Sequence, residues 1–374
     1  MNNNIIKMLL IACSLFSICT GWAQLFVLPA NDPHWNLVWH DEFNGDSINT
    51  SLWDFHAAWG NCSCSSSISP NQNNHNMHDG MVTLIAQQET DTCFMWQGGA
   101  TPNYYSKPYT SGCLYSQDTF KYGFFEIRSR FPAINYRKRP VQTGSGFSPC
   151  FWLYPTKYYY NPETNYSEID VYEIGGRENR HTCNVHYSDS LHLTDMTNPE
   201  NVIPGWSMRS NGDYSHDFIV NDGAFHVYSA LWNARYVSIY YDHGLVRRAE
   251  RHSSFNPGYF TPMNIVITNM ANSQNFYQDS INANTILPYP YDIDYVRVYH
   301  LQCDDTTVVN DIPDFSTYFY GVKQSITLSH ATTLPSNTSV YLRAKNFIKL
   351  QNGFEAPLGT TLYLITCSCE ADEQ

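Results

Sequence analysis

The sequence predicts an all-β protein: a sandwich or barrel of many short strands, followed by a smaller β unit. From Trp35 to His300, short runs alternate apolar and polar residues with a period of two, and Gly, Pro, Asn or Asp separates the runs. The sequence shows no convincing amphipathic helix with capping residues. Many short strands with turn-rich connections are typical of sandwiches and barrels.

Individual runs justify this prediction in turn. In "KYGFFEIRSRFP", residues 121–132, Phe124 and Glu126 share one face and Phe125 and Ile127 the other. The segment "HVYSALWNARYVSIYYDHGLVRRAE" contains two runs joined by "NAR", and "YDHG" is a hairpin signal that turns the second run back into "LVRR". The segment "PYDIDYVRVYHLQ" closes the region with a regular strand.

Residues 1–23 have the pattern of an export signal. Lys7 precedes a short apolar run over residues 8–19, and small residues come before the expected cleavage after Ala23. We therefore expect a protein that is secreted or held at the cell surface. Lipoprotein anchoring at Cys13 is disfavoured because this cysteine falls early in the apolar run. No later segment approaches the roughly 18 apolar residues of a membrane span, so no integral membrane segment is expected.

The remaining chain divides into two expected domains. Residues 30–302 form the main domain, and the polar stretch "CDDTTVVNDIPD" places its boundary near residue 303. Residues 303–374 form a small accessory β module, in which "AKNFIKLQNGFEAPLGTTLYLIT" predicts short strands separated by tight Gly turns.

Composition narrows the class of partner. The formal net charge is −13, which argues against nucleic acid or an anionic membrane, because both require a basic face. Aromatic residues make up 15% of the chain, with 28 Tyr and 9 Trp, and such side chains suit planar, sugar-like ligands. A neutral partner is the better fit.

The cysteines favour disulfides over metal. Of the 11 cysteines, Cys13 and Cys19 lie in the expected signal, so an odd number remains in an exported chain. The motif Cys-Ser-Cys occurs at residues 62–64 and 367–369, but its spacing is not the usual one for zinc. Cys303 with one cysteine of the second motif is a candidate staple for the accessory module.

The segment "YSEIDVYEIGG", residues 166–176, places three carboxylates at uneven intervals. On a regular strand Glu168 and Asp170 share a face, whereas Glu173 points into the core. An unpaired buried carboxylate is unfavourable. One extra residue in a β-bulge, Val171 or Tyr172, would return Glu173 to the face of the other two.

Three acids on one face repel one another and raise the proton affinity of at least one of them, as acid–base chemistry near neutral pH requires. Retaining glycoside hydrolysis uses such a set, with one carboxylate as nucleophile and a protonated partner for the leaving oxygen. The alternative is a solvent-exposed acidic strand edge, and the short pattern alone does not separate the two.

The order of several motifs resolves this ambiguity. Between residues 35 and 300 the chain resembles glycoside hydrolase family 16, in the branch whose active-site strand carries a bulge. The resemblance is carried, in order, by "LVWHDEFNGDSINTSLWDF", "DGMVTLIAQQ", "YTSGCLYSQDTFKYGFFEIRSRFP", "FWLYP", "SEIDVYE", "FHVYSALW" and "PYDIDYVRVY".

The resemblance implies a jelly-roll sandwich with a concave substrate cleft. It makes Glu168 the nucleophile, Glu173 the general acid/base and Asp170 the assisting acid, with no cofactor required for catalysis. The expected activity is endo-acting, retaining hydrolysis of β-linked polysaccharide by a monomer, with laminarin-type β-1,3-glucan favoured. Algal galactans (agar, porphyran or carrageenan) are the alternative, as is an inactive carbohydrate-binding sandwich, which the intact acids disfavour. Transglycosylation by the same residues stays open.

Further residues are carried over from the resemblance with a packing role as the alternative to each. Trp152 would lie beside the cleaved sugar, His186 near the acid/base, and Trp206 on a sugar-stacking loop. Arg177 and Arg180 could meet a sulfate, although a solvated turn is the better explanation.

A structural calcium ion is also implied, held by Glu42, the Gly80 carbonyl and Asp294, which are oxygen donors as calcium requires. The sequence departs from the glucan-cleaving pattern at Phe147 and Ser167, which leaves the substrate open. The tail resembles a small β module at the ends of secreted bacterial enzymes.

Overall fold

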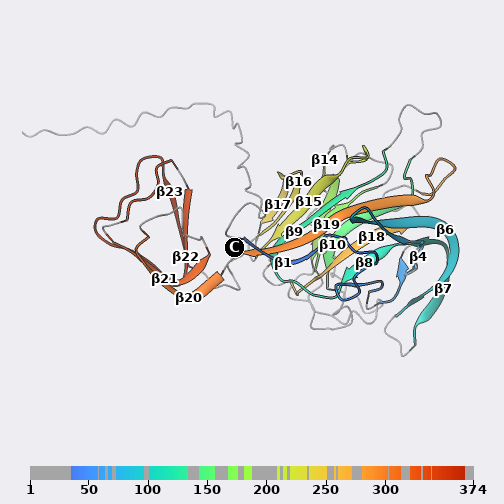
Figure 1. Ribbon diagram of the computed structural model, residues 1–374, viewed down its shortest axis with the longest axis horizontal. Helices are drawn as coiled ribbons and strands as arrows, with labels where there is room; N and C mark the ends of the chain where they lie inside the picture. Colours follow the sequence, from blue (N-terminus) through green and yellow to red (C-terminus); the bar gives the residue numbers. More distant parts are fainter. Residues whose placement is uncertain are drawn as a thin grey trace, which may run out of the picture.

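The computed structural model describes a large part of the chain. Its residues are 35–57, 59–63, 66–69, 73–96, 101–133, 143–155, 167–175, 181–187, 209–210, 214–216, 220–233, 236–250, 257, 260–271, 280–301, 303–312, 321–329, 332–337 and 339–366. Within these ranges every named element is a strand, which confirms the all-β prediction (Figure 1). Among the same residues, no helix has the length and apolar character needed to cross a membrane. The expected signal, residues 1–23, lies outside them.

The larger sheet has 11 strands in the order β17, β16, β15, β9, β19, β6, β7, β4, β3, with β1 beside β19 and β5 beside β6. Its strands are β1 (Trp35–Asp41), β3 (Cys62–Ser63), β4 (Ser66–Ile68), β5 (His75–His78), β6 (Met81–Met95), β7 (Asn103–Ser111), β9 (Gly123–Arg130), β15 (His226–Trp232), β16 (Tyr236–Tyr241), β17 (Gly244–Glu250) and β19 (Tyr289–Leu301). Strands β16 and β17 form the hairpin predicted at "YDHG", where Asp242 and His243 have φ values of 43° and 69°.

The second sheet has 8 strands in the order β13, β12, β11, β10, β18, β8, β2, with β14 beside β12. Its strands are β2 (Trp53–Asp54), β8 (Cys113–Ser116), β10 (Phe147–Tyr154), β11 (Ser167–Glu173), β12 (His181–Tyr187), β13 (Arg209–Ser210), β14 (Tyr214–His216) and β18 (Asn264–Ala271).

The two sheets enclose one hydrophobic core, so the sandwich prediction is confirmed. Phe125 and Ile127 of β9 belong to the same buried cluster as Phe151 and Leu153 of β10. These residues alternate with others that point away from the core, as the period-two pattern requires. The face of the 8-stranded sheet that points away from the other sheet is therefore not part of this core.

A third sheet of 4 parallel strands follows β19: β20 (Cys303–Asn310), β21 (Val322–Leu328), β22 (Ser339–Leu350) and β23 (Thr361–Thr366). An isolated parallel bridge outside these strands joins Thr333 to Glu355. Gly353 and Gly359 have positive φ in the turn before β23, in agreement with the predicted Gly turns. The sheets divide between β19 and β20 (Figure 1), but the domain boundary at residue 303 remains a prediction.

The structure contains one disulfide among the described cysteines, in line with the prediction of disulfides over metal. Cys62 and Cys93 form a disulfide, which removes Cys62 from any metal motif. Cys113, Cys150 and Cys183 are buried and take no part in a disulfide. The first two lie on strands separated by β18, about 9–10 Å apart at ordinary strand spacing, which is too far for a disulfide. The accessory-module staple involves residues whose side chains lie outside the described part.

Candidate active site

Strand β11 carries the three acids and a β-bulge at its centre. Glu173 pairs with Cys150 of β10 and Asp170 pairs with Trp152, so two residues of β11 oppose a single residue of β10. The extra residue is Val171. The bulge that the uneven spacing predicted is therefore present, at one of the two expected positions.

The bulge gives the acids a common face. Val171 and Tyr172 are adjacent in the chain, yet both are fully buried in the core between the sheets. Asp170 and Glu173 oppose residues two apart on β10, and residues two apart share a face. Glu168 lies two residues before Asp170 and shares that face as well. Glu168 and Glu173 are partly exposed, and Asp170 is buried.

Two side chains that sequence reasoning missed hold the bulge. The Val171 carbonyl accepts a hydrogen bond from Nε2 of His181 at 2.8 Å, and His181 is fully buried. The Tyr172 hydroxyl hydrogen-bonds the Ser129 hydroxyl at 3.0 Å and the Tyr291 hydroxyl, both in the opposite sheet. The bulged backbone is thus fixed to the neighbouring strand and across the core.

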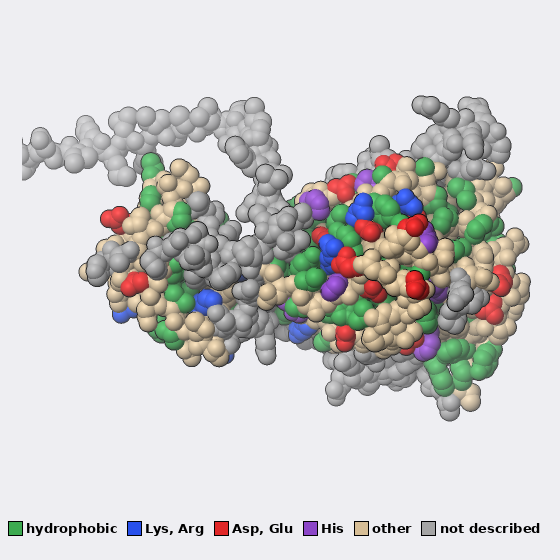
Figure 2. Space-filling model, viewed as in Figure 1, with side chains coloured by type: hydrophobic (Ala, Val, Ile, Leu, Met, Phe, Trp, Pro, Cys, Tyr) green, Lys and Arg blue, Asp and Glu red, His purple; other side chains and the backbone are tan. Residues whose placement is uncertain are grey.

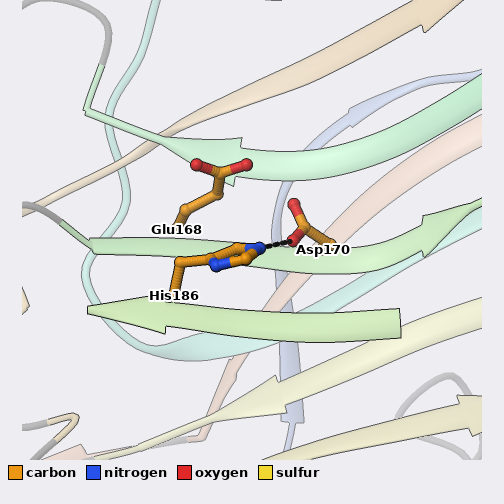
Figure 3. A group of neighbouring side chains, drawn as sticks. All are labelled: Glu168, Asp170 and His186. Carbon is orange, nitrogen blue, oxygen red and sulfur yellow. Dashed lines mark ion pairs between the residues drawn. The ribbon is translucent and has the colours of Figure 1, made fainter. Parts of the chain in front are cut away.

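His186 of β12 completes the acid cluster (Figure 3). It lies opposite Glu168 in the β11–β12 ladder, and its Nε2 is 3.2 Å from Oδ2 of Asp170. Donor atoms of Glu168, Asp170 and His186 lie within 4.8 Å of one another. This donor set could hold a metal ion, but the same closeness serves acid–base chemistry, so geometry alone does not choose between them. The structure thus places His186 beside Asp170 and Glu168, whereas the resemblance placed it near the acid/base Glu173, and its role in substrate binding stays a prediction.

The negative charges of the acids affect the pKa values of two neighbouring thiols. Burial raises the pKa of Cys150, and the negative charges of Glu173 and then Asp170 raise it further. Burial likewise raises the pKa of Cys183 to about 12, with a smaller contribution from Asp170. Both thiols are therefore protonated near neutral pH, and neither is a ready nucleophile.

Aromatic side chains lie on the same face, on the β10 side of the acids. Trp152 is partly exposed, donates from Nε1 to the Thr268 hydroxyl at 3.3 Å, and packs against Tyr154 with ring centroids 5.5 Å apart. Tyr154 follows Trp152 by two residues, so the strand period could have placed it here from the sequence. Trp152 lies opposite Asp170 in the β10–β11 ladder, its contact with the cleaved sugar stays a prediction, and Trp206 lies outside the described residues.

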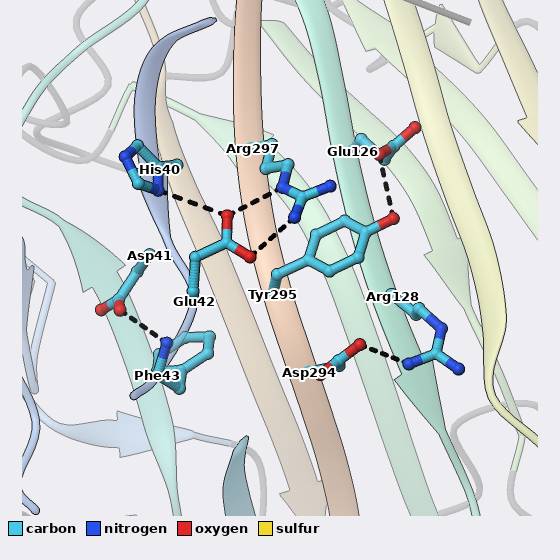
Figure 4. Close-up of polar contacts among 9 residues, drawn as sticks. All are labelled: His40, Asp41, Glu42, Phe43, Glu126, Arg128, Asp294, Tyr295 and Arg297. Carbon is cyan, nitrogen blue, oxygen red and sulfur yellow. Dashed lines mark hydrogen bonds and ion pairs between the residues drawn. The ribbon is translucent and has the colours of Figure 1, made fainter. Parts of the chain in front are cut away.

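The carboxylates assigned to calcium lie on the other sheet and face arginines (Figure 4). The Glu42 carboxylate accepts two hydrogen bonds from Arg297, at 2.8 and 2.7 Å, and lies 3.3 Å from His40. Asp294 forms an ion pair with Arg128. The hydrogen bond and charge of Arg297, with a smaller contribution from His40, hold the pKa of Glu42 below its usual value.

These contacts do not fit a calcium ion as the side chains are placed. A cation at Glu42 and Asp294 would compete with two guanidinium groups that are charged at any physiological pH. Gly80 has a positive φ of 71°, and a side chain there would approach Asn44 within 3.1 Å. This glycine thus has a conformational reason to be present that does not involve a metal.

Several known proteins are similar in sequence to most of the larger domain. The chain is 27% identical over 290 residues to glucan endo-1,3-beta-glucosidase A1 from Niallia circulans, covering 71% of this chain and 38% of that protein. It is 25% identical over 287 residues to a beta-glucanase from Rhodothermus marinus, covering 71% and 86%. It is 25% identical over 240 residues to a kappa-carrageenase from Pseudoalteromonas carrageenovora, covering 60% and 56%. The chain thus spans well under half the length of the first relative.

Solved structures agree on the fold. The LamA catalytic domain from Zobellia galactanivorans matches with a TM-score of 0.52 and 22% identity, over 71% of this chain and 98% of that one. The catalytic domain of an endo-1,3-beta-glucanase (laminarinase) from Thermotoga petrophila matches with a TM-score of 0.52 and 19% identity, over 72% and 98%. At these identities the likeness supports the jelly-roll sandwich and nothing finer.

The family follows from one further match. The model of glycosyl hydrolases family 16 covers residues 65–296, more than half of the chain, and this range includes the bulged strand with its acids. The chain therefore belongs to glycosyl hydrolases family 16.

Proposed function

We propose that this protein is an exported, endo-acting, retaining hydrolase of β-1,3-glucan. The observation that carries the proposal is the bulge at Val171, which turns Glu168, Asp170 and Glu173 to one face of β11. A solvent-exposed acidic strand edge would need no bulge, because surface carboxylates are stable whichever way they point into solvent. The proposal also predicts that the polysaccharide lies across this face in a concave cleft.

In the first chemical step, the Glu168 carboxylate attacks the anomeric carbon of the bound sugar. The bond from that carbon to the glycosidic oxygen breaks, and the leaving oxygen takes a proton from the Glu173 carboxyl. The product is a covalent glycosyl ester on Glu168, and Glu173 is left as a carboxylate. The departing glycan carries the new hydroxyl group.

In the second step, Glu173 acts as the base. It removes a proton from water, whose oxygen attacks the anomeric carbon and displaces Glu168. The anomeric configuration is retained after two inversions, and both acids return to their starting states. Transfer to a sugar hydroxyl in place of water would give transglycosylation by the same route.

Asp170 and His186 support the nucleophile. Asp170 is buried beside Glu168, and its Oδ2 lies 3.2 Å from Nε2 of His186. A proton shared between this pair lets Asp170 hydrogen-bond the nucleophile when needed and limits the repulsion between adjacent carboxylates. Asp170 can thereby donate a hydrogen bond to the Glu168 carboxylate when Glu168 carries its negative charge.

The substrate is inferred from the relatives. Two of them carry names of β-glucan hydrolases, and these align over more of this chain than the kappa-carrageenase does. A β-1,3-glucan is therefore the favoured substrate, and a galactan is the alternative. Arg177 and Arg180, which could meet a sulfate, lie outside the described residues.

Export, the monomeric state and the accessory role of residues 303–374 belong to the same proposal. The pattern of residues 1–23 supports export, and the net charge of −13 supports a neutral polysaccharide over an anionic partner. A structural calcium remains a prediction of the family resemblance, and the Arg297 and Arg128 contacts weigh against it.

The test is a time course of reducing-end release from laminarin, lichenan, agarose, porphyran and carrageenan. Release from laminarin first, as internal fragments with retained anomeric configuration, is the expected result. Release from a galactan alone would replace the substrate. Binding without release from any of the five would identify a carbohydrate-binding sandwich.

A matched pair of variants tests the assignment of the nucleophile. Glu168→Gln should lower kcat by roughly 10⁴-fold or more while glycan binding persists, because the attacking oxygen is lost. Glu250→Gln, an exposed position on β17, should behave as the parent. Persistent turnover by Glu168→Gln would mean that another carboxylate attacks.

A further inference from the structure

Apart from the three acids and Trp152, a second group of aromatic residues lies on the acid-bearing face of the 8-stranded sheet. Trp59 comes from the segment before β3 and is partly exposed. Its ring meets Tyr154 of β10 edge-on at 5.4 Å and Tyr115 of β8 at 6.3 Å. Trp59 and Trp152 both pack on one buried cluster that contains these tyrosines. Two partly exposed indoles thus lie over the buried rings of Tyr115 and Tyr154, which we call the aromatic floor.

Strand register places this group relative to the acids. Tyr115 pairs with Val266, and Val266 pairs with Trp152. Trp152 in turn pairs with Asp170 on β11. A glycan chain that crosses the strands at the acids therefore continues over β10, β18 and β8, directly toward Trp59.

The segment that carries Trp59 is fixed to the long β6–β7 hairpin. The disulfide joins Cys62 to Cys93 of β6. The Trp59 carbonyl accepts a hydrogen bond from the Trp96 amide at 2.8 Å, and the Asn61 amide donates to the Phe94 carbonyl at 3.0 Å. These three attachments span the four residues from Trp59 to Cys62, so the indole is held by backbone and covalent links together.

The turn between these attachments accepts only glycine. Gly60 has a φ of +118°, and a Cβ there would lie 2.2 Å from the Phe94 carbonyl oxygen. The close approach of the two backbones thus depends on Gly60 as well as on the disulfide. In this conformation the Trp59 ring contacts Tyr154 and Tyr115.

We propose that Trp59 is a sugar-binding wall of the substrate site on the β8–β10 side of the acids, and that the Cys62–Cys93 disulfide positions it. The ligand is a neutral pyranose unit of the β-glycan, two or more units from the bond that is cleaved. Sugar faces present C–H groups that stack on indole rings, and partly exposed Trp residues beside a site provide such surfaces. This inference rests on the proposed hydrolase function and adds a specificity-determining residue to it.

The experiment follows cleavage of β-1,3-linked gluco-oligosaccharides of four to seven units, labelled at the reducing end. Trp59→Ala should lower kcat/KM for the longest oligosaccharide by about tenfold and for the tetramer by less, since one stacking contact is removed. It should also move the preferred cleavage position along the labelled chain. A fold-maintaining role alone would lower rates on all lengths without moving the position.

Three companion variants make the result decisive. Trp59→Phe keeps an aromatic face and should lie between the parent and Trp59→Ala. Tyr104→Ala removes an exposed ring on β7 of the same hairpin and should behave as the parent. The double variant Cys62→Ser/Cys93→Ser should shift the cleavage position in the same direction as Trp59→Ala, and adding Trp59→Ala to it should produce little further change.

The outcomes separate this inference from the proposed function. If the parent protein cleaves the oligosaccharides and Trp59→Ala gives the same length dependence and the same products, Trp59 is not a sugar-binding wall. If Trp59→Ala shifts the products but the double cysteine variant does not, the disulfide does not position it. If the parent releases no sugar from any glycan, the hydrolase proposal fails, and weaker binding of the hexamer by Trp59→Ala would still support the wall.

Discussion

Carboxylates on the two sheets of the sandwich are held by different partners. On the outer face of the 11-stranded sheet, Glu42 is bound by Arg297 and Asp292 by Arg130, whose Nε lies 2.6 Å from the carboxylate. On the acid-bearing face of the 8-stranded sheet, Asp170 has His186 as its ion-pair partner. Figure 2 shows acidic, basic and histidine side chains intermixed on the face turned to the viewer.

The partner decides what a carboxylate can do. A guanidinium is always charged, so it fixes the neighbouring carboxylate in its ionised form, as the lowered pKa of Glu42 shows. An imidazole changes charge near neutral pH, so it leaves its carboxylate able to respond to a reaction. Glu126 lies on the same sheet but accepts its hydrogen bond from the Tyr295 hydroxyl at 3.0 Å, and burial raises its pKa. The partner and the burial of a carboxylate, and not its sheet, therefore set its pKa.

The largest expected effect compares one glutamate from each region. Glu173→Gln should lower kcat on laminarin by about 10²–10⁴-fold, because the leaving oxygen loses its proton donor. Glu42→Gln should leave kcat within twofold of the parent. Initial rates with purified, folded proteins measure both.

An activated substrate sharpens this comparison. An aryl β-glucoside of the same glycan has a leaving group that needs no proton, so the loss of glycosylation rate in Glu173→Gln should largely disappear on it, whereas Glu168→Gln should stay inactive. Equal defects on both substrates would contradict the acid/base role of Glu173.

Much of this site could be predicted from the sequence because its signals are local. The alternation of apolar and polar residues depends on nearest neighbours, and the uneven gap before Glu173 required a bulge within two residues. The hairpin at Asp242 and His243 followed from turn residues in the same way. Each of these features is determined by a short segment.

The features that were missed depend on register between distant segments. His181 reaches the Val171 carbonyl, and Arg297 reaches Glu42, only because particular strands are neighbours with a particular offset. Cys113 and Cys150 lie on strands separated by β18 and form no disulfide with each other, which a count of cysteines does not reveal. Sequence spacing does not fix such contacts when the partners are far apart along the chain.

The second prediction concerns the β-bulge at Val171, which gives the three acids a common face. His181→Ala removes the donor to the Val171 carbonyl, so the bulge should relax and the acids should lose their alignment. We expect kcat to fall by about 10–100-fold with KM little changed, since small misplacements of reacting groups have effects of that size. Steady-state kinetics on laminarin would show this split.

A rescue experiment separates alignment from general folding. His181→Gln retains an N–H donor and should recover part of the lost kcat, and thermal melting should show that both variants are folded at the assay temperature. A fall in melting temperature with kcat unchanged would assign His181 to stability alone.

The third prediction tests the outer face. Arg297→Ala should lower the free energy of unfolding at pH 7 by roughly 1 kcal/mol, because the pair is only partly buried. The folded-state pKa of Glu42 is lowered, so its contribution is present above the unfolded-state value of about 4.3 and is lost as pH falls through the folded-state value.

The pH dependence of unfolding tests whether Arg297 stabilises the protein through the ionised Glu42 carboxylate. Denaturant melts should show the full difference of roughly 1 kcal/mol between Arg297→Ala and the parent at pH 7, and a difference that shrinks as the pH is lowered toward 3. Arg248→Ala, whose guanidinium stacks on Tyr236 at 4.3 Å, controls for loss of an arginine with a different contact. A constant difference across this range would mean that Arg297 acts through packing and not through Glu42.

The smallest effect is expected from metal. If arginines already neutralise Glu42 and Asp294, removing divalent ions with EDTA should leave the melting temperature of the parent unchanged within about 1 °C. Adding millimolar calcium should raise it no more than adding magnesium. A calcium-specific rise would restore the calcium site that the family resemblance implies, and the double variant Arg128→Ala/Arg297→Ala should then bind calcium more tightly, because two competing positive charges are gone.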